Sequence, residues 1–112
     1  MPSYLYQVSY TSEAWSALSK NPQNRLEAIR PVIEGMGGRL VTGYFAFGEY
    51  DVILIVDYPN NVAAAAFSVA ASGGGAIKAI KTTPLISIDD GTEIMRMAAE
   101  SGYSPPFEEI ME

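Results

Sequence analysis

The stretch 39–58 constrains the fold most strongly, because it reads as two strands joined by a tight turn at Gly48-Glu49. Glycine supplies the positive φ that a two-residue hairpin turn needs at its first position. The second strand, 50–58, is apolar on both faces apart from two aspartates. Such a strand is typical of the buried centre of a sheet. We therefore predict a hairpin of strands 39–47 and 50–58.

Periodicity and turn residues predict the other elements. Residues 3–10 alternate between two faces, which indicates a strand. Residues 12–36 carry apolar side chains at helical spacing, with a break near Lys20. Asn21 as the cap and Pro22 in the first turn predict a restart of the helix there. Similar reasoning predicts a helix over 62–72, a strand over 76–83, a short helix over 92–100 and an extended arm over 102–112.

The predicted order of elements defines the fold class. Strand-helix-strand-strand-helix-strand is the split β-α-β, ferredoxin-like arrangement of an α+β protein. Right-handed crossovers give an antiparallel sheet with strand order 4-1-3-2 and both helices on one face. We predict one domain over 1–101, which includes the extra C-terminal helix, followed by an acidic arm over 102–112.

The hairpin register divides its side chains between two faces. The face that suits the helix-covered core carries Phe45, Phe47, Tyr50, Val52, Leu54 and Val56. The opposite face is half apolar, with no helix left to cover it, and carries Leu40, Thr42, Tyr44, Ala46, Asp51, Ile53, Ile55 and Asp57. Monomers seldom expose such a patch, so we predict a homo-oligomer, most simply a two-fold dimer through the open sheet face.

Composition excludes several kinds of chemistry. The 112 residues include no Cys and no His, which excludes disulfides, thiol nucleophiles, Cys/His zinc sites and imidazole catalysis. We expect no metal and no cofactor. Residues 1–88 carry equal numbers of acids and bases, so the net charge of −6 resides in 89–112. That balance argues against nucleic acid and membrane partners. The start of the chain lacks a signal-peptide pattern, and we expect a cytoplasmic protein.

The predicted topology brings several polar and aromatic side chains to one end of the sheet. There the strand 3–10 ends, the first helix begins, and the hairpin turn lies close to the junction after the second helix. We predict a ligand cleft between the start of the third strand, the first helix and the fourth strand. The predicted ligand-binding residues are Tyr10, Trp15, Tyr44, Glu49, Tyr50, Asp51, Lys78 and Lys81.

Each group of these residues has a structural and a functional interpretation. Asp51 either accepts hydrogen bonds from free N–H groups and a tyrosine hydroxyl at this corner, or acts as a general base or ligand anchor. Lys78 and Lys81, on opposite faces of their strand, either protect a sheet edge or bind an anionic or carbonyl ligand. The aromatic side chains either pack the core or line a pocket.

The segment Phe47-Gly48-Glu49-Tyr50-Asp51, with supporting segments 35–38 and 78–85, resembles the GYD domain family of small bacterial and archaeal proteins. The resemblance covers roughly 1–100 and implies a fold related to the dimeric α/β barrels, without an established activity. The leading hypothesis is an oligomeric domain that binds a small molecule. One alternative is a cofactor-independent monooxygenase or isomerase, with Asp51 as base and Tyr50 or Tyr44 as donor. The other is a structural or regulatory assembly module.

Overall fold

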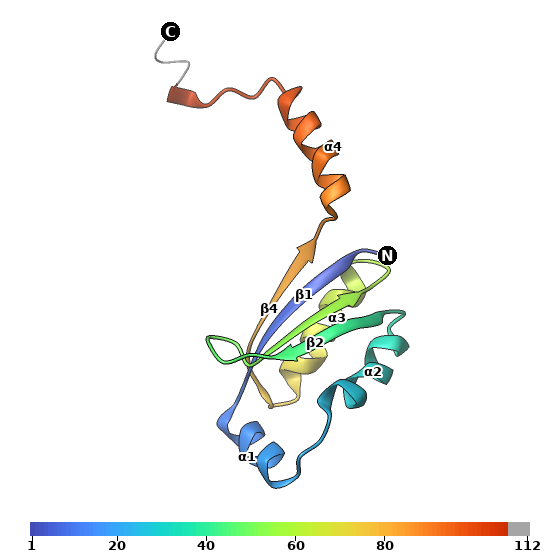
Figure 1. The fold of residues 1–112 in the computed structure, drawn as a ribbon, viewed down its shortest axis with the longest axis vertical. Coiled ribbons are helices and arrows are strands. Elements are labelled where there is room, and N and C mark those ends of the chain that lie inside the picture. The colour runs from blue at the N-terminus through green and yellow to red at the C-terminus, as the bar shows by residue number, and fades with distance from the viewer. Residues whose placement is uncertain (108–112) are drawn as a thin grey trace.

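The computed structural model describes residues 1–107, which form an antiparallel sheet with helices on one face (Figure 1). The described strands run in the order β2-β3-β1-β4, the reverse reading of the predicted 4-1-3-2. The predicted α+β class and sheet order are therefore confirmed. The strands are β1 (Ser3–Tyr10), β2 (Arg39–Phe45), β3 (Val52–Asp57) and β4 (Ile77–Leu85), and the helices are α1 (Ser12–Lys20), α2 (Arg25–Gly35), α3 (Asn61–Gly73) and α4 (Ile88–Ala99).

The region predicted as one interrupted helix is two helices, and the predicted point of restart is wrong. Thr11 caps α1, as its sequence position predicts. Asn21 closes α1 instead of opening the next helix, because its N–H donates to the carbonyl oxygen of Ala17 at 3.0 Å. α2 begins later, where the side chain of Asn24 accepts from the N–H of Leu26 at 3.0 Å. Residues 21–24 thus form an extended link between α1 and α2.

The predicted register of the hairpin is confirmed, and its predicted turn is wrong. Phe45 pairs with Val52, as expected. The two strands end at this pair. One further hydrogen bond, from the N–H of Ala46 to the carbonyl of Asp51 at 2.8 Å, closes a longer loop over 47–50. The positive-φ glycines among the described residues are Gly37, Gly75 and Gly102, so Gly48 is not held in the left-handed region.

The predicted face assignments of Leu40 and Phe47 are also wrong. A bulge at Val41 shifts the pairing, so that Leu40 lies opposite Val56 and is buried on the helix-covered side instead of the open face. Phe47 was expected in the core, and it is fully exposed because it belongs to the hairpin loop. The buried positions of β3 are nevertheless those predicted from alternation: Val52, Leu54 and Val56.

Tyrosines dominate the packed end of the core. Tyr6 is fully buried, its ring lies edge-on to Phe67 at 5.2 Å, and its hydroxyl donates to the carbonyl of Ala64 in α3 at 2.7 Å. The Tyr4 hydroxyl donates to the side chain of Asn61 at 2.5 Å. Burial raises the pKa of Tyr58, whose hydroxyl has no hydrogen-bond partner within the described chain. These contacts hold α3 on the sheet.

The C-terminal helix α4 extends away from the sheet (Figure 1) and buries none of its residues. It begins earlier than the predicted 92–100, because Ser87 caps it through the N–H of Asp90. Of the predicted arm 102–112, the last five residues lie outside the described residues. Within 1–107, no helix has the length and apolar character needed to cross a membrane.

Asp57 joins three strands at the sheet end that lies opposite the hairpin loop. Its carboxylate accepts from the Ser3 hydroxyl at 2.5 Å and from the Arg39 guanidinium at 2.8 Å. Ser3 and Arg39 are its register partners on β1 and β2. The hydrogen bond from Ser3 and then that from Arg39 lower the pKa of Asp57 below its ordinary value.

We expect Asp57→Asn to reduce the free energy of unfolding at pH 7 by about 1–2 kcal/mol, because it removes charge-assisted hydrogen bonds. The lowered pKa means that the carboxylate stabilises the fold above the unfolded-state pKa, and that this stability is lost as the pH falls through the folded-state pKa. Urea unfolding should therefore show a difference from wild type that is full at pH 7 and closes below the ordinary aspartate value of 3.8. Glu34→Gln, at an exposed position, is the control. A difference independent of pH would contradict the assignment.

Candidate functional site

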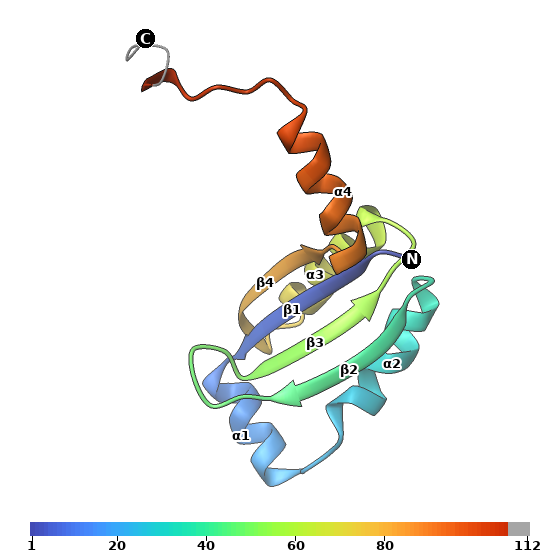
Figure 2. The same ribbon diagram turned by 45° about the horizontal axis from the view of Figure 1, so that its top comes forward.

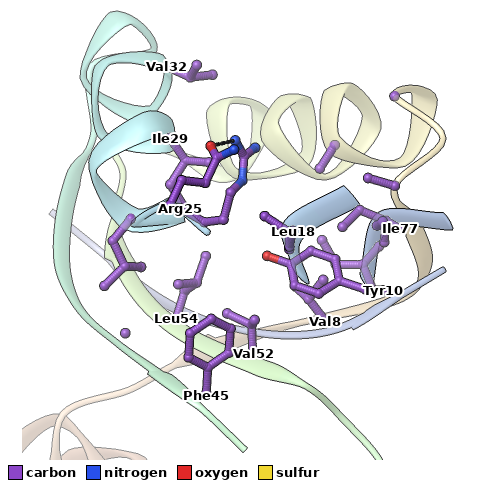
Figure 3. A pocket seen from close by; sticks show the side chains of 18 of the residues that line it. Val8, Tyr10, Leu18, Arg25, Ile29, Val32, Phe45, Val52, Leu54 and Ile77 are labelled. Atoms are coloured by element: carbon purple, nitrogen blue, oxygen red, sulfur yellow. Dashed lines mark hydrogen bonds between the residues drawn. The ribbon is translucent and has the colours of Figure 1, made fainter. Parts of the chain in front are cut away.

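A large apolar cavity lies between the sheet and the helices α1, α2 and α3 (Figure 3). Its volume is about 820 Å³. The sheet contributes Val8, Val52 and Leu54 to its floor, α1 contributes Leu18, and α2 contributes Ile29. Most of the remaining lining is aliphatic or small, so the cavity favours an apolar occupant.

The small residues that face the cavity explain why it is not filled. α1 presents Ala14 and Ala17, and α3 presents Ala70 and Ala71. Alanine side chains reach little beyond the helix backbone, so helices covered by them leave space above the sheet. α1 has no buried residue. Ala70 and Ala71 therefore line a cavity at this end of α3 instead of packing directly on the sheet.

One charged side chain lines the cavity in the described chain, Arg25 at the start of α2. Its guanidinium donates to the side-chain oxygen of Gln23 at 3.0 Å, and Asn24 lines the same edge. Figure 3 shows this guanidinium among the apolar lining side chains, with the Tyr10 hydroxyl also directed inward. The cavity thus combines apolar walls with one cationic region.

Tyr10 lies at the boundary between the cavity and the corner formed by β1 and α1. Its ring packs edge-on against Trp15, with the ring centroids 5.2 Å apart. Burial raises the pKa of Tyr10, and the nearby Arg25 guanidinium partly opposes this effect. Tyr10 therefore stays protonated near neutral pH, and its hydroxyl is available as a hydrogen-bond donor.

Asp51 stabilises this corner. One carboxylate oxygen accepts from the N–H of Tyr10 at 2.8 Å and from the indole N–H of Trp15 at 3.3 Å. Its own N–H donates to the carbonyl of Val8 at 2.8 Å. Asp51 does not line the cavity. This geometry agrees with the structural interpretation of Asp51, although its donors are a backbone amide and an indole and not a tyrosine hydroxyl.

A second, smaller hollow of about 360 Å³ lies on the open face of the sheet. Glu49 and Tyr50 reach it from the hairpin loop, Lys81 from β4, and Gln7 from β1. Tyr50 therefore belongs to the open side, where the sequence pattern placed it in the core. The hollow is shallower and more polar than the cavity on the helix-covered side.

The sequence-predicted ligand residues are consequently divided between the two sides of the sheet. Tyr10 and Tyr44 line the cavity, and Trp15 packs beside Tyr10 at its rim. Glu49, Tyr50 and Lys81 line the hollow on the open face. Asp51 lies at the corner of β1 and α1 and lines neither space. Lys78 is the exposed, unpaired residue of the bulge in β4, and it also lines neither space.

Sequence reasoning missed Arg25 and the helix α2 as parts of the site. The apolar stripe of α2, at helical spacing in the sequence, includes Leu26 and Ile29, and both residues pack partly against the core. The available signal was the position of Arg25 immediately before that stripe. A cation in the first turn of a helix opposes the helix dipole, so its placement there was unusual.

Fold and site together define a small α+β domain of ferredoxin-like arrangement with an apolar cavity between its sheet and its helices. A family model for the GYD domain matches residues 4–95. The chain belongs to the GYD domain family.

Comparison with solved structures gives a likeness to the crystal structure of MtbAldR, with a TM-score of 0.51 and 21% sequence identity over 77% of this chain. The chain spans about half of that protein, 52% of its length. At this identity the likeness concerns the fold alone. No curated protein matches the sequence.

Asp51→Ala should loosen the corner between β1 and α1, because the Tyr10 amide and the Trp15 indole lose their shared acceptor. We expect faster hydrogen exchange of the Tyr10 amide and altered Trp15 fluorescence, with a loss of about 1–3 kcal/mol in the free energy of unfolding. Glu49→Ala, in the same loop and exposed, is the matched control. Unchanged exchange and fluorescence in Asp51→Ala would contradict the structural role.

Proposed function

We propose that this protein binds a small, largely apolar molecule in the cavity between the sheet and helices α1, α2 and α3. The observation that carries the proposal is the cavity itself, about 820 Å³ with mainly aliphatic walls. This volume lies within the range of roughly 300–1,000 Å³ typical of ligand pockets. Empty apolar space of this size forfeits dispersion contacts that a ligand would restore.

The proposed site differs from the cleft predicted from the sequence. That cleft was expected between the start of β3, α1 and β4, and it relied on polar residues of the hairpin loop. The proposed cavity is also bounded by α2 and α3, and only Tyr10 and Tyr44 of the predicted ligand residues line it. The hairpin loop contributes through Asp51, which positions Tyr10 and Trp15.

Binding is favoured over the alternative of a cofactor-independent monooxygenase or isomerase. That alternative used Asp51 as a general base, and both N–H contacts of its carboxylate lie at the corner outside the cavity. No carboxylate lines the cavity within residues 1–107. A proton-abstracting role therefore has no acidic side chain to carry it at the proposed site.

Filling the cavity should weaken binding. We expect wild-type protein to bind Nile red, a neutral dye whose fluorescence rises in apolar surroundings, and Ala71→Phe to weaken that binding at least tenfold because the new ring occupies the cavity. Ala65→Phe adds the same ring at an exposed position of α3 and should leave binding unchanged. Fluorescence titration measures both variants. Equal binding by Ala71→Phe and wild type would refute the site.

A second proposal concerns assembly through the open face of the sheet. Leu5, Ile53 and Ile55 lie on this face, and Figure 2 shows it without a covering helix in the described chain. These side chains are only partly buried in a single copy. Two copies packed face to face would remove them from water, as in a two-fold dimer.

Analytical ultracentrifugation tests this assembly. We expect wild-type protein to sediment as a dimer and Ile55→Lys to shift it toward the monomer, because a buried unpaired ammonium group at a sheet–sheet interface is costly. Val69→Lys places the same charge on the exposed side of α3 and should leave the dimer intact. A monomeric wild-type protein at micromolar concentration would refute the proposal.

A further inference from the structure

We infer that the ligand of the cavity is an amphiphilic monoanion, a carboxylate on an alkyl or aryl body, with its carboxylate held by Arg25. This inference rests on the proposed binding function and adds the chemical class of the ligand. It follows from the charge of Arg25, from the absence of an ion pair to Arg25 among residues 1–107, and from the apolar character of the rest of the cavity.

Arg25 carries a positive charge that the described part of the chain does not neutralise. Its guanidinium donates a hydrogen bond to the neutral side-chain amide of Gln23. The ion pairs of the described residues are Arg30 with Glu27, Arg39 with Asp57 and Arg96 with Glu93. Of the arginines in the chain, Arg25 is thus the one without a carboxylate partner within residues 1–107.

The surroundings of Arg25 make this missing partner significant. The residue is partly buried and lies beside aliphatic side chains such as Ile29 (Figure 3). A charge removed from water is stabilised by an opposite charge that also satisfies its hydrogen bonds. A planar guanidinium matches a carboxylate, which accepts two parallel N–H bonds from it.

The other polar groups near Arg25 are donors or neutral. The Tyr10 hydroxyl is directed into the cavity (Figure 3), and it remains protonated near neutral pH because burial raises its pKa. Gln23 and Asn24 supply side-chain amides at the edge of the cavity. Their arrangement suits one anionic head group that receives several hydrogen bonds.

The remaining lining sets the rest of the ligand. Val8, Leu18, Val52, Leu54 and Ile77 offer no polar side-chain atom, so the body of the ligand is apolar. A single cationic side chain balances a single negative charge. A dianion such as a phosphate monoester would leave one charge unneutralised in apolar surroundings, and a cationic amphiphile would face Arg25 repulsion.

Calorimetric titration with chain-matched ligands tests this inference. We expect wild-type protein to bind decanoate at least tenfold more tightly than decanol and to show no binding of decylamine. A second ligand, 2-naphthoate, carries the same carboxylate on an aromatic body, so its affinity compared with that of decanoate distinguishes an aryl from an alkyl body. Whichever of the two carboxylates binds more tightly identifies the body that the cavity prefers.

Variants of Arg25 separate charge from shape. Arg25→Gln should weaken carboxylate binding about tenfold or more and leave decanol binding unchanged, because only the charge-assisted hydrogen bonds are lost. Arg25→Lys should retain part of the preference for the carboxylate. Arg30→Gln, on the same helix but outside the cavity, is the control and should behave as wild type.

The outcomes distinguish this inference from the proposed function. Equal affinity for decanoate and decanol, or carboxylate binding that survives Arg25→Gln, would overturn the anionic class while Nile red binding still supported the cavity as a binding site. Loss of Nile red binding in Arg25→Gln would show that this variant has lost the cavity. The inference then depends on Arg25→Lys, which supports it if this variant prefers decanoate over decanol and overturns it if this variant binds the two equally. Absence of binding by every probe to wild-type protein would overturn both.

Discussion

The hydrogen bond from the buried Tyr6 hydroxyl to the carbonyl of Ala64 is the contact on which the packed layer depends. Tyr6 is fully enclosed, and a buried phenol is stabilised when its hydroxyl has a hydrogen-bond partner. The partner lies in α3, so the side chain that fills the core also fixes the position of the helix. Tyr4, two residues earlier on β1, makes a similar hydrogen bond to the side chain of Asn61 in α3. Together the two hydrogen bonds set both the distance and the direction of α3 on the sheet.

This arrangement also explains where the packed core ends. The tyrosine pairs and Phe67 occupy the sheet beneath the first half of α3, and beyond them β1 presents Val8, a much smaller side chain. α3 continues over this region with alanines, and α1 covers it without burying a residue. The cavity is therefore a consequence of a change in side-chain size along one helix and one strand.

The parts of the fold governed by periodicity were predictable from the sequence. The alternation in β1 and the buried face of β3 agree with the prediction, because successive side chains of a strand point to opposite faces and residues two positions apart share a face. The choice between Asn21 and Asn24 as the cap of α2 was not predictable, since both side chains suit a helix start and only the closing bond of α1 decides. The bulge at Val41 is not visible in the alternation of apolar and polar residues along β2. It places Leu40 on the helix-covered face instead of the open face.

The site was predictable only in part, because the predicted cleft collected residues from one end of the sheet without separating its two faces. Tyr10 and Tyr44 were found, whereas Glu49, Tyr50 and Lys81 lie across the sheet from the cavity. Arg25 shows the opposite limitation. In the sequence it is a single charge near a helix start, and its significance comes from the structure, in which Arg25 forms no ion pair among residues 1–107. A counter-charge brought by a ligand would complete, at this end of the core, the kind of neutralised contact that Asp57 makes with Arg39 at the other end.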